Sequence, residues 1–293
     1  MQTMKCIGIV TDSHGGISPE EAKNLGVMVM PMPFYVGDRC CYEGVDLSRE
    51  EFMNCLTAGE SVSTSQPSPQ TVVNTWREAL KEYESILYLP LSSGLSGACT
   101  FAKVLALDEE FKNRVYVVDN GRISTPMHRA ILDALELIEK GCSVSDIKDQ
   151  LEANGAEMSI YIAVETLEYL KKGGRITPAV AALGSVLNIK PILSLNTGKL
   201  DQYKKCRGMK KAKKEMLAAI QKDLETKFAA PYQEGKIHLL AATSADEETT
   251  AAWLNEIKEE FPNMEILCDP LSFGIACHTG PGALGIGISV SVL

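Results

Sequence analysis

The sequence lacks any apolar run long enough to cross a membrane, and positive charge is sparse in it. No stretch approaches the ~18 uninterrupted apolar residues of a transmembrane helix, although apolar residues make up 45 % of the 293 positions. The 29 Lys and Arg against 38 Asp and Glu leave a formal charge of −9, whereas nucleic-acid binding depends on basic surfaces that neutralise phosphates. Neither stable membrane insertion nor a nucleic-acid partner is therefore expected.

Signals for disulfides, metals and common enzyme motifs are also missing. The nine cysteines are odd in number and never spaced as CxxC, which argues against a disulfide framework and a structural zinc site. The first apolar run is too short for a signal peptide, so a cytoplasmic protein with reduced thiols is expected. The phosphate-binding pattern GxxxxGK[ST] is absent, and no metal-ligand spacing joins the four histidines, His14, His128, His238 and His278. No metal, no cofactor and no catalytic residue is predicted.

Apolar runs alternate with amphipathic segments through the first half of the chain. Strand-like runs fall at 6–10, 27–36, 86–91 and 115–118, and helical patterns at 19–25, 69–83, 97–107 and 126–140. This alternation predicts a parallel sheet with helices on both faces. A hydroxyl residue followed by Pro, which marks a helix start, recurs at Ser18, Ser68, Thr125 and Thr177.

The second half has a less regular pattern. Strands are expected at 159–164, 190–195, 236–242, 264–268 and 286–292, and helices at 165–171, 177–187, 209–228 and 247–260. The long helix places Ala212, Met216, Ile220 and Leu224 on one apolar face. We expect an α+β lobe with a mixed sheet. The change follows a helix at 144–153, which divides the chain into domains 1–155 and 156–293.

Two hydroxyl-rich loops stand where an anion could bind. Residues 61–68 hold five Ser or Thr in eight positions, and Ser92, Ser93 and Gly94 turn the chain before a helix that starts near Ser96. The strand ends of a parallel sheet lie along one edge, so these loops can converge there with unpaired helix-start amides. Without clustered Lys or Arg, such a pocket suits one carboxylate better than a triphosphate. Alternatively, residues 88–106 form a capped helix whose glycines serve packing.

A glycine-rich segment near the C-terminus matches GxGxxG formally at 280–285. Only eight residues follow it, so it cannot open the βαβ unit of a dinucleotide site. His278 stands before it in an expected loop, where it either donates a hydrogen bond to an oxyanion or has a structural role. A serine acyl hydrolase or acyltransferase using Ser93 or Ser96 with His278 is the alternative function, although the GxSxG pattern fails at Ala98.

One basic cluster stands out from the acidic background. Residues 204–214 hold seven Lys or Arg in eleven positions. They form either a solvated helix face or a docking surface for an acidic or phosphorylated partner. The docking surface is favoured by the mild electrostatic cost of positive charge at a helix N-terminus, where it opposes the helix dipole. Upstream, Arg175 follows two glycines in a loop from which it could close over a ligand, bind a partner or form a salt bridge.

Six motifs taken together resemble the DegV family of bacterial fatty-acid-binding proteins. They stand in order over residues 10–285, nearly the whole chain: VTDS at 10–13, TSQP at 64–67, LSSGLSG at 91–97, GGRI at 173–176, IKPIL at 189–193, and the segment from Gly274 through His278 to Gly285. The resemblance implies a DegV-like two-domain α/β fold. Its N-terminal domain would be a three-layer α/β/α arrangement on a parallel sheet, and its C-terminal domain an α+β unit with a mixed sheet.

The resemblance also implies a ligand, which is one long-chain fatty acid (C14–C18, for example palmitate) bound between the domains. Its tail would lie in an apolar tunnel, and its carboxylate would meet Thr64, Ser65, Ser93, Gly94 and His278.

Family members similar to the binding subunit of bacterial fatty acid kinase present the acid to a separate kinase. The resemblance therefore implies a kinase partner, with Arg175 and Arg207 as docking residues. The chain itself would be a carrier rather than an enzyme.

Overall fold

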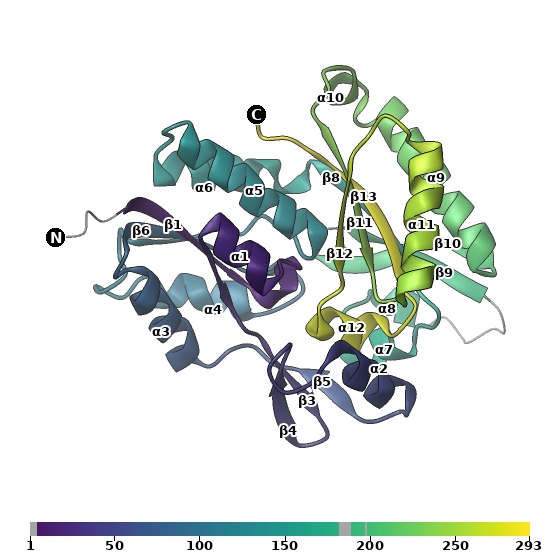
Figure 1. The fold of residues 1–293 in the computed structure, drawn as a ribbon, viewed down its shortest axis with the longest axis horizontal. Coiled ribbons are helices and arrows are strands. Elements are labelled where there is room, and N and C mark those ends of the chain that lie inside the picture. Colours follow the sequence, from purple (N-terminus) through teal and green to yellow (C-terminus); the bar gives the residue numbers. More distant parts are fainter. Residues whose placement is uncertain (1–4, 182–188, 197) are drawn as a thin grey trace.

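The computed structural model describes residues 5–181, 189–196 and 198–293, and it consists of two lobes side by side (Figure 1). A four-stranded sheet forms the centre of the N-terminal lobe, a six-stranded sheet that of the C-terminal lobe, and a three-stranded sheet lies beneath both. The predicted fold class, a two-domain α/β fold with a parallel N-terminal sheet and a mixed C-terminal sheet, is confirmed. No helix in the described ranges is both long and apolar enough to cross a membrane.

The N-terminal sheet is parallel throughout, in the order β2-β1-β6-β7. Its strands are β1 (Lys5–Asp12), β2 (Val27–Met30), β6 (Tyr83–Leu89) and β7 (Val115–Val117). The last four residues of β6 are all buried, as a central strand requires when helices cover both faces of its sheet. Those helices are α1 (Pro19–Leu25), α5 (Thr125–Glu139) and α6 (Val144–Ala153) on one face, and α3 (Pro69–Ala79) and α4 (Ala98–Leu105) on the other.

Two of the expected helix starts follow the predicted chemistry, and one differs. The hydroxyls of Ser18 and Ser68 accept hydrogen bonds from backbone amides in the first turns of α1 and α3, at 3.2 and 3.1 Å. At α5 the N-cap position is taken by Ser124 instead of Thr125. The Thr125 hydroxyl donates to the Ala241 carbonyl at 2.8 Å, because α5 packs against the C-terminal sheet and a contact between the lobes replaces the local cap.

The C-terminal sheet is mixed, in the order β10-β9-β8-β13-β11-β12. Its strands are β8 (Met158–Ala163), β9 (Ile189–Asn196), β10 (Lys199–Arg207), β11 (Ile237–Thr243), β12 (Ile266–Pro270) and β13 (Leu284–Val290). β11 and β12 pair in parallel, and the other described pairs are antiparallel. The glycines at 280–285 lead into a strand rather than a helix, in agreement with the rejected dinucleotide site.

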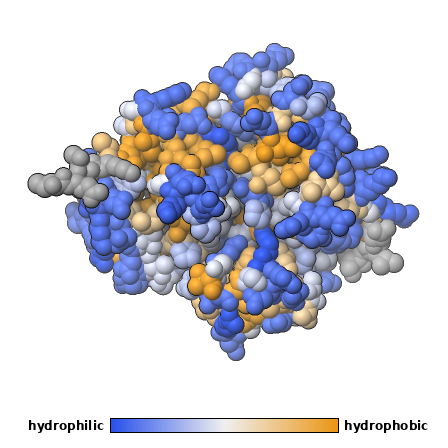
Figure 2. All heavy atoms as spheres, viewed as in Figure 1, coloured by the Kyte–Doolittle hydropathy of each residue, from blue (hydrophilic) through white to orange (hydrophobic). Residues whose placement is uncertain are grey.

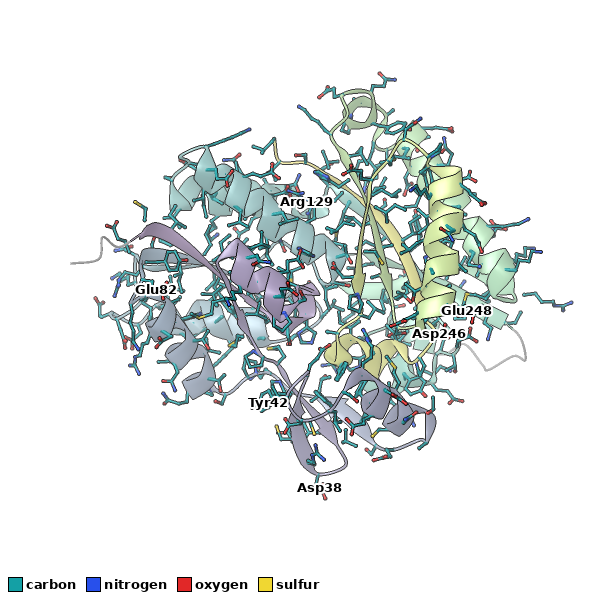
Figure 3. The ribbon with its side chains drawn as sticks, viewed as in Figure 1. Asp38, Tyr42, Glu82, Arg129, Asp246 and Glu248 are labelled. Carbon is teal, nitrogen blue, oxygen red and sulfur yellow. The ribbon has the colours of Figure 1, made fainter. Side chains whose placement is uncertain are left out.

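Two long helices, α9 (Met209–Glu225) and α11 (Glu247–Glu260), cover the outer face of the C-terminal sheet (Figure 1). The apolar stripe predicted from Ala212 to Leu224 is fully buried. The Asp246 carboxylate caps α11 by accepting a hydrogen bond from the Thr249 amide at 2.7 Å, and Glu248 adds negative charge to the first turn (Figure 3). The opposite face of the sheet is left to meet the N-terminal lobe.

A small subdomain, residues 33–64, departs from the expected pattern. The run 27–36, expected to form one strand, divides into β2 and β3 (Pro33–Val36), which belong to different sheets, because Pro31 has no amide to continue the first ladder. β3 pairs with β4 (Arg39–Tyr42) and β5 (Val62–Thr64), and α2 (Arg49–Thr57) packs beside them. The subdomain carries Thr64 to the C-terminal lobe.

The remaining helices lie in the C-terminal lobe: α7 (Glu168–Gly173), α8 (Pro178–Ala181), α10 (Ala229–Gln233) and α12 (Phe273–Thr279). The helix expected at 177–187 is described only through Ala181, and the rest of it lies outside the described residues. β10 and α12 were not predicted. In Figure 2, polar and charged side chains cover the outer helices, and hydrophobic side chains show beside α5 and near β12 and β13.

Candidate ligand-binding cavity

A cavity of about 260 Å³ lies between the two lobes and the small subdomain. Both lobes contribute apolar side chains to its wall, including Leu91 and Leu95 of the N-terminal lobe and Ile162, Leu240 and Ile275 of the C-terminal lobe. Leu91 and Leu95 lie at the carboxyl edge of the parallel sheet, Ile162 and Leu240 lie on the mixed sheet, and Ile275 lies on a helix beside it. Ligands of open α/β folds bind at that edge. The wall is mostly apolar, with a small number of polar groups.

Thr64 and His278 form a polar part of this wall. The Thr64 hydroxyl, at the end of β5, lies 3.0 Å from Nε2 of His278 on α12. The expectation that His278 stands in a loop is wrong, since it belongs to the last turn of α12, whose start is capped by the Ser272 hydroxyl. Gly173 of α7 lies directly against the imidazole, where a Cβ atom would clash with Nδ1. A side chain at 173 would therefore displace the histidine.

Burial holds His278 in its neutral form. Desolvation, with smaller electrostatic contributions from Arg175 and His14, lowers the pKa of the imidazole to about 4. Among the described residues, Nδ1 is buried without a hydrogen-bond partner. Desolvation disfavours any charge here, whereas the positive charge of Arg175, which also disfavours a proton on His278, favours an anion in the same place. This part of the cavity therefore suits a carboxylate that lies beside a neutral histidine rather than a protonated one.

Arg175 and Ser65 also line the cavity. The Arg175 guanidinium donates a hydrogen bond to the Gly173 carbonyl next to His278. The loop that follows Gly173 and Gly174 thus places the positive charge of Arg175 in the candidate site. Ser65 follows Thr64, and its hydroxyl donates to the Gln66 carbonyl at 3.2 Å. The structure thus brings together Thr64, Ser65, Arg175 and His278.

Ser93 and Gly94 lie beside the cavity and are not among its lining residues. Ser93 is exposed, and both its amide and its hydroxyl hydrogen-bond the Asp119 carboxylate. Gly94 touches the backbone of Gly198 so closely that neither residue can carry a side chain. For Ser93 to reach a bound carboxylate, its hydroxyl has to leave Asp119.

Arg207 is not among the residues that line the cavity. It is exposed at the end of β10, where α9 begins, within the basic segment 204–214. Two lysines of that segment are paired, Lys204 with Glu215 at 2.6 Å and Lys213 with Glu256. The structure therefore separates Arg207 from the cavity that Arg175 lines.

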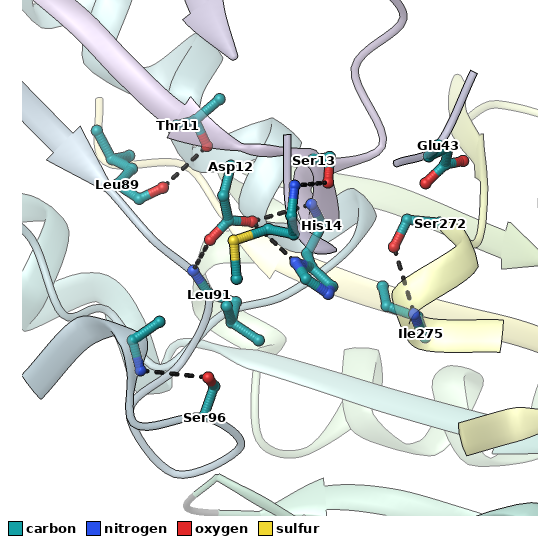
Figure 4. A network of polar contacts seen from close by, with 12 residues as sticks. Thr11, Asp12, Ser13, His14, Glu43, Leu89, Leu91, Ser96, Ser272 and Ile275 are labelled. Atoms are coloured by element: carbon teal, nitrogen blue, oxygen red, sulfur yellow. Dashed lines mark hydrogen bonds and ion pairs between the residues drawn. The ribbon is translucent and has the colours of Figure 1, made fainter. Parts of the chain in front are cut away.

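Sequence reasoning missed His14 as a cavity residue. The Asp12 carboxylate accepts hydrogen bonds from the amides of Leu91 and His14 at 2.8 and 2.9 Å, and it lies 3.2 Å from Nδ1 of His14 (Figure 4). The Asp12 side chain therefore joins the ends of β1 and β6 and turns His14 towards the cavity. The polar run at the end of β1, residues 11–14, was the available signal, since it includes both residues.

Among the residues that the structure describes, neither Ser93 nor Ser96 forms a hydrogen-bonded pair with a histidine of the cavity. His278 hydrogen-bonds to Thr64, whereas Ser93 is bonded to Asp119 and the Ser96 hydroxyl accepts from the Ala98 amide. A nucleophilic serine needs a base within hydrogen-bond distance. Within the described ranges, no three His, Cys, Asp or Glu side chains are placed to hold a metal ion.

The fold and the cavity define a class of protein with two α/β lobes around an apolar cavity that has a polar, anion-favouring part. A family model described as "Uncharacterised protein, DegV family" matches residues 6–291, so the chain belongs to the DegV family. It is 31 % identical over 283 residues to a DegV domain-containing protein of Deinococcus radiodurans, a match that covers 96 % of this chain and 98 % of that one. Protein DegV of Bacillus subtilis is 30 % identical over 283 residues, with 96 % and 98 % covered.

Solved structures agree with this assignment. A DegV family protein from Thermus thermophilus, described as binding fatty acid, superimposes with a TM-score of 0.85 at 34 % identity, covering 97 % of this chain and 99 % of that one. DegV of Bacillus subtilis, described as a fatty acid binding protein, gives a TM-score of 0.83 at 27 % identity, with 98 % and 100 % covered.

Proposed function

We propose that this protein binds one long-chain fatty acid (C14–C18, such as palmitate) in the cavity between its lobes, residues 1–155 and 156–293. The carboxylate meets Thr64, Ser65 and His278, and the tail lies along the apolar wall. The observation that carries the proposal is a mostly apolar cavity in which a hydroxyl, a neutral imidazole and the Arg175 guanidinium come together. DegV family proteins described as fatty-acid-binding share this fold.

The tail supplies the affinity, and the polar groups set the orientation. Burial of ~15 methylenes contributes roughly 0.8 kcal/mol each, about 12 kcal/mol before the costs of association. Hydrogen bonds to a carboxylate contribute only about 1.5–3 kcal/mol each, and they mainly offset its desolvation. Arg175 supplies the opposite charge that a buried carboxylate needs. Ser93 and Gly94 stay predictions, with Ser93 turning from Asp119 to the ligand.

We further propose that the protein is a carrier in the cytoplasm that presents its fatty acid to a separate kinase. The fatty carboxylate would take the γ-phosphoryl group of ATP on the kinase, which releases ADP and forms an acyl phosphate. Arg207 and the neighbouring lysines form an exposed basic surface suited to such a partner. Arg175, in the loop next to the cavity, would lie where the kinase reaches the carboxylate.

The experiment combines delipidated protein, hexadecanoic acid, ATP and a fatty acid kinase. Arg207→Glu should bind the acid as tightly as the wild type, because Arg207 does not line the cavity, yet acyl-phosphate formation should fall at least about tenfold, since charge reversal repels an acidic partner. Lys236→Glu, on an exposed position outside the basic segment, is the matched control. If the wild type takes up no acid, the binding proposal is wrong. If Arg207→Glu supports full turnover, only the docking proposal is wrong.

A further inference from the structure

Ser124 is a cavity residue that the carboxylate site does not use. Its amide donates to the His14 carbonyl at 2.8 Å, and its own carbonyl accepts from the amides of Met127 and His128 at 2.7 and 3.0 Å. The hydroxyl is buried and has no hydrogen-bond partner among the described residues. With only 7 % of the residue exposed, water from the surface does not reach the hydroxyl. One polar atom in this wall is thus unsatisfied.

The backbone holds this hydroxyl in place at a conformational cost. Ser124 has φ 57° and ψ −147°, a combination that residues other than glycine rarely adopt. The flanking contacts fix it, through the His14 carbonyl on one side and the Thr125–Ala241 hydrogen bond on the other. A glycine would relieve the strain and remove the hydroxyl. Strained, polar positions of this kind are concentrated at binding sites.

Ser124 lies in a different part of the wall from the Thr64–His278 pair. Ser124 belongs to the start of α5, next to β11, whereas Thr64 ends β5 and His278 ends α12. Its neighbours in the wall include Ile123, Pro126 and Leu240. The first turn of this fifteen-residue helix adds the positive end of the helix dipole. Ser124 therefore lines the part of the cavity beside β11, which we assign to the hydrocarbon tail, and its Oγ, with less than 1 Å² of accessible surface, meets a ligand when the side chain turns towards the cavity.

We propose that Ser124 and the first turn of α5 form a second polar subsite, which takes an oxygen carried within the acyl chain, as in a hydroxy fatty acid. This inference rests on the proposed fatty-acid binding. A serine hydroxyl can both donate to and accept from a chain hydroxyl, whereas a plain hydrocarbon leaves it unpaired. A second carboxylate fits less well, because Arg175, the one Lys or Arg among the described lining residues, is placed beside His278.

The test compares hexadecanoic acid with a panel of hydroxyhexadecanoic acids that differ in the position of the hydroxyl. Competition for delipidated wild-type protein should rank at least one positional isomer about three- to tenfold above the parent acid. Ser124→Ala and Ser124→Gly should both abolish that preference, and Ser124→Gly also removes the backbone strain. Thr64→Ala, the matched control, should weaken every acid in the panel and keep the preference.

The outcomes separate this inference from the function on which it rests. If no isomer is preferred, or if the preference survives in both Ser124 variants, the subsite is wrong and the hydroxyl holds at most a buried water. Fatty-acid binding then stands. If neither the parent acid nor any isomer binds to the wild type, the proposed function fails, and the subsite fails with it.

Discussion

Thr64 and His278 lie 214 residues apart in the chain, and their side chains are 3.0 Å from each other. The pair joins the small subdomain to the C-terminal lobe and stands in the cavity wall. The neutral imidazole can act as donor or acceptor, according to its tautomer. A carboxylate that arrives here can therefore accept from the Thr64 hydroxyl, with His278 either supporting that hydroxyl or donating directly.

The first prediction concerns this residue pair. Thr64→Ala removes a carboxylate donor and the partner of His278, so affinity for hexadecanoic acid should fall about three- to tenfold, while burial of the tail is unchanged. Displacement of a fluorescent fatty acid from the delipidated protein measures the change. Ser63→Ala is the matched control, because Ser63 precedes Thr64 in β5 and is exposed. If Thr64→Ala and Ser63→Ala bind hexadecanoic acid equally well, Thr64 is not part of the carboxylate site.

At the scale of single residues, the sequence indicates part of the cavity wall, including Arg175, and misses other residues of it. The residue pattern indicated the hydroxyl-rich loop 61–68, the family resemblance implied Thr64 and Ser65 within it, and both line the cavity. His14 and Ser124 were missed as cavity residues. The polar run at the end of β1 was a signal for His14, whereas the placement of Ser124 depends on the long-range contact of α5 with β11. The proposed role of Ser93 depends on breaking its hydrogen bonds to Asp119.

Among the elements, α12 is the one that places His278. The Glu43 carboxylate accepts a hydrogen bond from the Phe273 amide at the start of α12, at 2.9 Å. Arg49 donates to the Leu271 carbonyl at 2.8 Å, and the rings of Phe52 and Phe273 stack at 4.4 Å. Burial raises the pKa of Glu43, although the amide hydrogen bond and the charge of Arg49 oppose that effect. The small subdomain thus holds the helix that carries His278.

The second prediction follows from this contact between elements. Glu43→Ala leaves the Phe273 amide unpaired, which should cost about 1–3 kcal/mol and increase amide hydrogen exchange in α12 and β5. Bound fatty acid should also dissociate faster, because Thr64 and His278 lie on the two elements that separate. Glu50→Ala, at an exposed position of α2, is the control. If amide hydrogen exchange in α12 is no faster in Glu43→Ala than in this control, the small subdomain does not hold α12 through Glu43.

Elements with strong periodicity were predictable, and short ones were not. The parallel strands, α9 and α11 follow from apolar runs and from a 3.6-residue repeat. The small subdomain is built from strands of three or four residues, too short to show an alternation. α12 contains Gly274 and is followed by Gly280, so its sequence was interpreted as a loop. Packing of Phe273 on Phe34 and Phe52, together with the Ser272 cap, stabilises it as a helix.

At the scale of the whole molecule, a buried histidine–carboxylate contact joins α5 of the N-terminal lobe to the C-terminal sheet. The buried His128 of α5 lies 3.1 Å from Asp269 of β12 through Nδ1, and 3.2 Å from Glu21 of α1 through Nε2. Burial lowers its pKa, but the hydrogen bond and charge of Asp269, with the charge of Glu21, outweigh burial and Arg129, so the pKa is raised. Figure 3 shows Arg129 where α5 meets the C-terminal lobe.

The third prediction is a pH dependence with a definite sign. Because the folded pKa of His128 exceeds the ordinary 6.5, its contribution to stability is complete below pH 6.5 and is lost as pH rises through the folded pKa. Asp269→Asn should therefore lower the free energy of unfolding on the order of 2 kcal/mol at pH 6, and less at pH 9. Denaturant unfolding at both values measures it. A larger loss at pH 9 would contradict the assignment.

The central claim, that the cavity holds a fatty acid, is tested most directly by the mass of the intact protein. Native mass spectrometry of protein purified without added lipid should show one adduct per chain with the mass of a C14–C18 fatty acid, released on denaturation. Thr64→Ala should retain less of it. A protein that is repeatedly bare, and that also takes up no added hexadecanoic acid, would contradict the account.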